Sequence, residues 1–128
     1  MRVDRLLKLA DLLDTVPPQQ FDMGKWSDST EFTCNTVACA GGWACSIPEF
    51  EKDGLFLTTD EWGYLVCFGK KSATAALMAF FESKEDVINS TFYSETYHAS
   101  TITPTMVAAR IREKVREYAP DTATRPAF

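Results

Sequence analysis

The sequence lacks several features that would point directly to a function. It has a single histidine, His98, and no apolar run that approaches the ~20 residues of a membrane span. Charged residues interrupt its start, where a secretory signal would need a continuous apolar core. Internal repeats and low-complexity tracts are also missing. We therefore expect a cytoplasmic protein that does not associate with membranes and keeps its thiols reduced.

The sequence also has too little positive charge for a general nucleic-acid binder. Its 13 basic and 18 acidic side chains give a formal net charge of −5, whereas nucleic-acid binding normally uses a basic field. The last predicted helix is locally basic, through Arg110, Arg112, Lys114 and Arg116. Such a face is usually just solvated, but it leaves room for a small anionic ligand or an acidic partner.

The length and the hydrophobic pattern predict one domain of the α+β class that is predominantly helical. We expect a globular domain over residues 1–120 and a flexible C-terminal tail over 121–128. Apolar spacing and capping signals predict about five helices, over 2–14, 36–45, 72–81, 83–92 and 103–118. Two β-rich runs, 55–57 and 64–68, flank a turn and predict one small β-hairpin.

The most informative segment runs from Cys34 to Cys45, because it holds three of the four cysteines, two adjacent glycines and Trp43. We expect a helix that begins near Thr36, after a cap at Asn35 or Thr36. Two glycines inside a helix cost up to ~1 kcal/mol each relative to alanine. The pair therefore predicts the close approach of another backbone or of a ligand.

One interpretation of this segment is a ligand site without catalysis. The exposed amides at the expected helix start can hold a phosphate or carboxylate, and tryptophans can stack on a base. Lysines such as Lys25 would supply charge. The candidate ligand-binding residues are Trp26, Asn35, Thr36, Val37 and Trp43. The alternative is ordinary helix capping with tryptophans that belong to the core.

Two further interpretations use the cysteines. Cys39, near a helix start, can act as a nucleophile in a hydrolase or transferase if His98 serves as its base. A structural zinc module would instead use Cys34, Cys39, Cys67 and His98 as ligands. The spacing Cys-x4-Cys-x5-Cys lacks the paired C-x-x-C pattern of common zinc sites, and a Cys34–Cys39 disulfide is a third arrangement.

The segment Cys34–Ala44 resembles a Cys-Gly-Thr-x-x-Cys-x-x-Gly-His/Trp-Ala signature of small bacterial and phage proteins of unassigned function. The resemblance extends to Phe21-Asp22-Met23-x-x-Trp26 and to Ile47-Pro48-Glu49-Phe50. This chain has Asn35 where glycine is usual, and asparagine tolerates the same left-handed backbone. The resemblance implies a prokaryotic or viral source, with the bacterial host cytoplasm as the location if the source is viral.

Together these observations predict a small non-enzymatic binding protein of bacterial or phage origin. It would sequester a small anionic ligand such as a nucleotide, or bind a host protein, and it can form a homo-oligomer. No cofactor is predicted.

Overall fold

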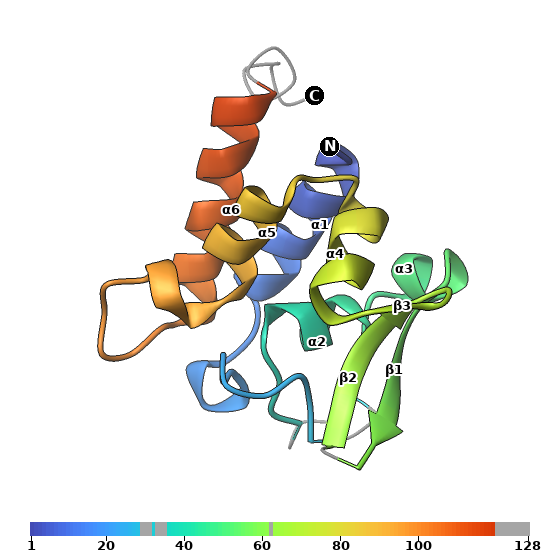
Figure 1. Cartoon of the computed structure of the whole chain (residues 1–128). Helices are drawn as coiled ribbons and strands as arrows, with labels where there is room; N and C mark the ends of the chain where they lie inside the picture. Colours follow the sequence, from blue (N-terminus) through green and yellow to red (C-terminus); the bar gives the residue numbers. More distant parts are fainter. Residues whose placement is uncertain (29–31, 33–35, 62, 120–128) are drawn as a thin grey trace.

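The computed structural model describes residues 1–28, 32, 36–61 and 63–119 (Figure 1). In these residues it has an α+β fold, with six α-helices and one antiparallel sheet, which confirms the predicted class. The helices are α1 (Val3–Leu13), α2 (Ala40–Ala44), α3 (Pro48–Lys52), α4 (Ala73–Phe81), α5 (Glu85–Phe92) and α6 (Pro104–Tyr118). Short 3₁₀ turns, η1 and η2, cover Pro18–Gln20 and Ser94–Thr96. The predicted tail, 121–128, lies outside the described residues.

The predicted β-hairpin is present and gains a short third strand. Strands β1 (Leu55–Asp60) and β2 (Gly63–Phe68) pair antiparallel, with Leu55 opposite Phe68 and Asp60 opposite Gly63. A third strand, β3 (Lys71–Ser72), then pairs with the end of β2. The helix α4 follows directly and packs against β2, so that the sheet is covered on that side (Figure 1).

The two longest helices form the centre of the helical layer. The apolar stripe of α1 includes Leu6 and Leu9, and that of α6 includes Val107 and Ile111; all four side chains are buried. The two helices pack along each other although they come from opposite ends of the chain (Figure 1). Helical spacing had predicted both stripes, because apolar residues three and four positions apart share one face.

A chain of phenylalanine rings joins this helical layer to the sheet. The rings of Phe50 and Phe80 have centroids 4.9 Å apart, and those of Phe81 and Phe92 are 5.3 Å apart. Phe80 also contacts Phe68 of β2 at 5.3 Å. Aromatic pairs in such edge-on or tilted arrangements add stabilisation beyond the area that they bury. This cluster fixes α4 and α5 relative to the sheet.

The half-buried Arg5 connects three parts of the fold. The guanidinium of Arg5 in α1 donates to the carbonyl oxygen of Phe80 at 2.6 Å and to the carboxylate of Asp53 at 3.1 Å. It also lies 4.0 Å from the centre of the Phe80 ring. The side chain of Arg5 is only 13% exposed, and these bonds replace part of its lost hydration, although its buried Nε has no hydrogen-bond partner.

Some local expectations were wrong at the ends of helices. The sequence predicted a helix from Thr36, but α2 begins only at Ala40, because residues 36–39 are extended and Ala38 bridges to Phe21. The sequence did not predict α3, which Pro48 starts as the first helical residue, where a missing N–H is harmless. The helix predicted over 83–92 begins only at Glu85, and the Ser83 hydroxyl donates to the carbonyl oxygen of Phe81.

The start of α6 is as predicted. The Thr103 hydroxyl accepts a hydrogen bond from the amide of Met106 at 3.3 Å, and Pro104 occupies the first helical position. Across the described ranges, no helix is both long enough and apolar enough to cross a membrane.

Candidate ligand-binding site

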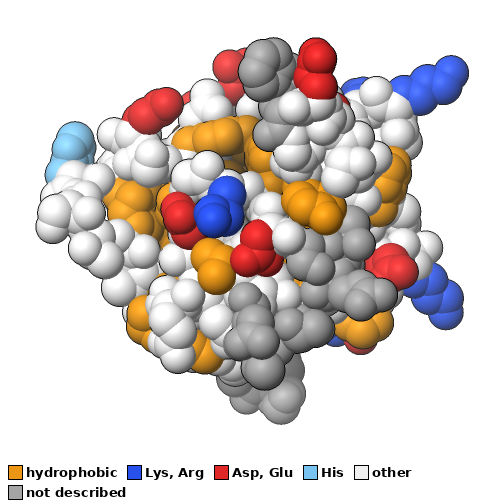
Figure 2. Space-filling view, turned by 90° about the horizontal axis from the view of Figure 1, so that it is seen from below, with side chains coloured by type: hydrophobic (Ala, Val, Ile, Leu, Met, Phe, Trp, Pro, Cys, Tyr) orange, Lys and Arg blue, Asp and Glu red, His pale blue; other side chains and the backbone are white. Residues whose placement is uncertain are grey.

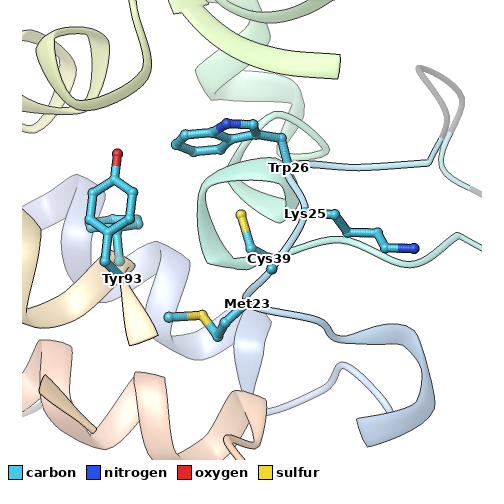
Figure 3. Close-up of a pocket in the computed structure, with 7 residues that line it drawn as sticks. Met23, Lys25, Trp26, Cys39 and Tyr93 are labelled. Atoms are coloured by element: carbon cyan, nitrogen blue, oxygen red, sulfur yellow. The ribbon is translucent and has the colours of Figure 1, made fainter. Parts of the chain in front are cut away.

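A cavity of about 200 Å³ lies between the loop 21–28 and the C-terminal end of α5 (Figure 3). It opens to the surface, and its wall combines aromatic rings, two sulfur-containing side chains and loop backbone. The residues that line it are Met23, Gly24, Lys25, Trp26, Cys39, Phe92 and Tyr93. Segments that are far apart in the sequence thus build one site.

Backbone hydrogen bonds hold the loop in place against residues 36–39. The amide of Asp22 donates to the carbonyl oxygen of Ala38 at 3.1 Å, and the amide of Cys39 donates to that of Lys25 at 2.9 Å. Asp28 and Val37 are joined by two bonds, because each amide donates to the other residue. A loop with its backbone paired in this way presents the side chains of Met23 and Trp26 from a fixed position.

The two glycines of α2 allow this loop to approach closely. A Cβ atom at Gly42 would overlap the backbone carbonyl of Trp26. A Cβ atom at Gly41 would lie 2.5 Å from Cζ3 of the Trp26 indole. The expectation that the glycines make room for a close neighbour is confirmed, and that neighbour is Trp26.

The aromatic walls of the cavity stand at a right angle. The rings of Trp26 and Tyr93 have centroids 6.2 Å apart and planes inclined by 87°. The Tyr93 hydroxyl shares a hydrogen bond of 2.6 Å with the hydroxyl of Thr74, which fixes the phenol. Figure 3 shows the Cys39 sulfur pointing towards Trp26, and the thioether of Met23 pointing towards Tyr93. Two aromatic rings and two sulfur atoms therefore meet at one corner of the cavity.

Burial controls the ionisation of the cavity's titratable groups. Burial raises the pKa of the Cys39 thiol to about 11, although the amides of Gly42 and Gly41 favour the thiolate. The nearby carboxylate of Asp22 adds to the increase. The pKa of Tyr93 is also raised, mainly by burial, with further contributions from Cys39 and Glu95. Both groups are therefore neutral near pH 7.

Of the predicted ligand-binding residues that the structure describes, only Trp26 lines this cavity. Trp26 forms a wall, whereas Trp43 is buried elsewhere and its indole N–H donates to the carbonyl oxygen of Gln20 at 2.9 Å.

The Val37 amide donates to Asp28, and Thr36 is buried, four residues before α2 begins. These two therefore do not present the open helix start that the sequence suggested. Asn35 lies outside the described residues.

The cysteine alternatives gain no support from the geometry. Cys39 is only 4% exposed, its pKa is raised rather than lowered, and none of the contacts of the described residues joins it to His98. His98 is exposed in the loop after η2, and Figure 2, the view from below, shows the histidine at the edge of the molecule.

Cys39, Cys45 and Cys67 are free thiols. Of the residues that the structure places, no group of three or more His, Cys, Asp or Glu can hold a metal; Cys34 is not among them.

Comparison with known proteins identifies no relative. The chain matches no family model, no curated protein and no solved structure. The chemistry of the site therefore has to be inferred from its own residues.

Sequence reasoning missed the α5 side of the cavity. Phe92 and Tyr93 end a short helix, and no local pattern separates them from ordinary core aromatics. Met23 was noticed only as part of the stretch that leads to Trp26. To single out Tyr93, the sequence would have had to reveal its contact with Trp26, which lies far from it along the chain.

Two further hollows adjoin the cavity around Gly24. One, of about 330 Å³, is lined partly by Ser94, Ser100 and Thr101. The other, of about 290 Å³, reaches Asp28 and Tyr64. Figure 2 shows hydrophobic side chains exposed among polar ones on the lower face of the molecule, with a basic side chain between acidic ones. A ligand in the cavity can therefore extend beyond it over polar surface.

Proposed function

We propose that this protein is a small non-enzymatic binding protein and that the Trp26–Tyr93 cavity is its binding site. The observation that carries the proposal is the pair of perpendicular aromatic walls around an open cavity. Small-ligand sites are typically concave and mostly apolar, with few polar groups. The resemblance to bacterial and phage proteins suggests the source, and the free thiols agree with a reducing cytoplasm.

The size of the cavity restricts its occupant. At about 200 Å³ it is smaller than the roughly 300 Å³ at which pockets for drug-sized ligands begin. A compact group, such as a base, an amine or one side chain of a partner protein, suits it better than a whole nucleotide. The phosphate of a nucleotide would have to lie outside, because Figure 3 shows the Lys25 ammonium pointing away from the cavity.

Binding is better supported than cysteine catalysis or a structural zinc site. A nucleophilic cysteine needs a thiolate near neutral pH, and burial raises the pKa of Cys39 instead. The loop that forms the cavity is fixed by backbone bonds and by packing on the two glycines of α2. Such a preformed wall lowers the cost of ordering on binding.

A thermal-shift screen with matched variants tests the proposal. The compounds would be amines, nucleobases, nucleosides and nucleotides, each measured with the wild type, Tyr93→Leu and Tyr118→Leu. Tyr118 is 42% exposed on α6 and lies outside the cavity, so its variant is the matched control. We expect a saturable increase in Tm for the wild type and Tyr118→Leu that Tyr93→Leu loses. The proposal fails if no compound raises Tm, or if Tyr93→Leu responds like the wild type.

Native mass spectrometry of the protein purified from cells complements the screen. It reports any retained small molecule and the number of subunits together. A homo-oligomer stays a prediction that this measurement decides.

A further inference from the structure

The charged groups that act on the cavity are acidic. Asp22 precedes the cavity residue Met23, and its carboxylate accepts a hydrogen bond from the amide of Gly24 at 2.7 Å. The negative charge of Asp22 helps to raise the pKa of the Cys39 thiol. The negative charge of Glu95 likewise helps to raise the pKa of Tyr93. The cation in the lining, Lys25, directs its ammonium away (Figure 3). This surrounding disfavours an anion and favours a cation.

The walls of the cavity also suit a cation. Aromatic faces attract a positive charge through their negative face, most strongly for tryptophan. Trp26 and Tyr93 form an edge-to-face pair at one corner of the cavity, and Met23 adds a polarisable thioether. An ammonium ion over an open ring face at this corner would therefore be attracted to it.

The side chains at this corner offer few hydrogen-bond acceptors to an ammonium group. The Tyr93 hydroxyl is engaged with Thr74, and the side chains of Met23, Cys39 and Phe92 carry only sulfur or hydrocarbon. A primary ammonium has three N–H donors and loses strong hydration when it is buried. A methylated ammonium has fewer donors or none, and its methyl groups fit apolar walls.

We propose that the Trp26–Tyr93 cavity binds a methylated organic ammonium group, held against the corner formed by the two rings and balanced by the carboxylate of Asp22. This inference rests on the proposed function, because it names the ligand class of the same site. The group can belong to a free small molecule or to a methylated lysine side chain of a partner protein. The chemistry of recognition is the same in both cases.

The decisive comparison uses choline and its neutral carbon isostere, 3,3-dimethylbutan-1-ol. Both are titrated into the full-length protein by calorimetry, with sodium chloride added to match ionic strength. We expect choline to bind about tenfold more tightly, since the two differ essentially in charge. Equal or tighter binding of the isostere overturns the inference and leaves the proposed site standing. If neither compound binds, the inference fails, whereas the proposed site is judged by the thermal-shift screen with its wider set of compounds.

A charge-neutral variant separates an electrostatic role from a structural one. Asp22→Asn keeps a carbonyl oxygen that can accept the hydrogen bond from the Gly24 amide. We expect it to weaken the binding of choline several-fold and to leave that of the isostere unchanged. An equal loss for both compounds would mean that Asp22 only supports the fold, and it would overturn its assigned role.

The source of the ammonium is resolved by a third titration, with a short peptide that contains trimethyllysine. Tighter binding of this peptide than of choline, and loss of binding for the same peptide with unmodified lysine, would assign the group to a protein partner. Tighter binding of choline would assign it to a free small molecule. Binding of the unmodified peptide as tightly as the methylated one would contradict the inference.

Discussion

The backbone carbonyl of Trp26 occupies the space that a Cβ atom would take at Gly42. The first wall of the cavity and the helix α2 are thus packed backbone against backbone. Only glycine permits this contact, and Cys39 and Trp26 are held beside the same cavity as a result. The two adjacent glycines therefore serve the construction of the site.

Gly42→Ala should destabilise the fold. The added methyl meets the backbone of Trp26, which cannot move without breaking the pairing of the loop with residues 36–39. We expect the free energy of unfolding to fall by about 1–3 kcal/mol in urea denaturation, even though alanine favours helices. Gly41→Ala is the matched comparison, because its methyl meets the Trp26 indole ring instead of the Trp26 backbone. Wild-type stability of Gly42→Ala would contradict this packing.

Cys39 should react slowly with alkylating reagents in the folded protein. Its thiol is buried, and its pKa of about 11 leaves little thiolate at pH 7. Iodoacetamide labelling followed by peptide mass spectrometry should show modification of Cys39 that increases with pH and is rapid only after denaturation. Fast labelling of the native protein at neutral pH would instead support the cysteine-dependent enzyme.

The same thiol should make stability depend on alkaline pH. The unfolded chain loses this proton near a pKa of about 9, while the folded protein keeps it until about 11. The folded state binds more protons in this window, so stability is full below pH 9 and falls as pH rises to 11. For Cys39 alone the loss is about 2–3 kcal/mol. Urea denaturation of wild type and Cys39→Ala should differ in slope there, and parallel slopes would refute the assignment.

Arg5 should contribute far more to stability than Arg2. Arg5 is largely buried and donates to the carbonyl oxygen of Phe80, whereas Arg2 makes exposed ion pairs. Arg5→Ala leaves that carbonyl without its partner, and we expect a loss of about 2–3 kcal/mol in the free energy of unfolding. Arg2→Ala, the control, should change it much less. Comparable losses for the two variants would contradict the tie through Arg5.

Much of the fold could be predicted because its signals are local. Apolar spacing located α1 and α6, and the Thr103-Pro104 pair located the start of α6. The start of α2 could not be predicted in this way. Ala38 forms a β-bridge with Phe21, a residue outside the local window that predicts helices. This bridge keeps residues 36–39 extended, although Thr36 is a residue type that commonly caps a helix.

The candidate site was predictable only in part for a similar reason. Trp26, Cys39 and the two glycines stood out because tryptophan, cysteine and adjacent glycines are scarce and chemically particular. Tyr93 looked like any other aromatic residue, since its role depends on where α5 packs. The direction of the Lys25 side chain is likewise a property of the folded loop, and it changes the expected charge of the ligand.

The most direct test of the cavity as the binding site is an NMR titration that follows the indole N–H signals. Trp26→Phe and Trp43→Phe assign the signals, and choline and 3,3-dimethylbutan-1-ol are the ligands. We predict that the Trp26 signal shifts and saturates with at least one of them, while the Trp43 signal, bonded to Gln20, stays in place. An unmoved Trp26 signal with both compounds, or an equal shift at Trp43, would contradict the account.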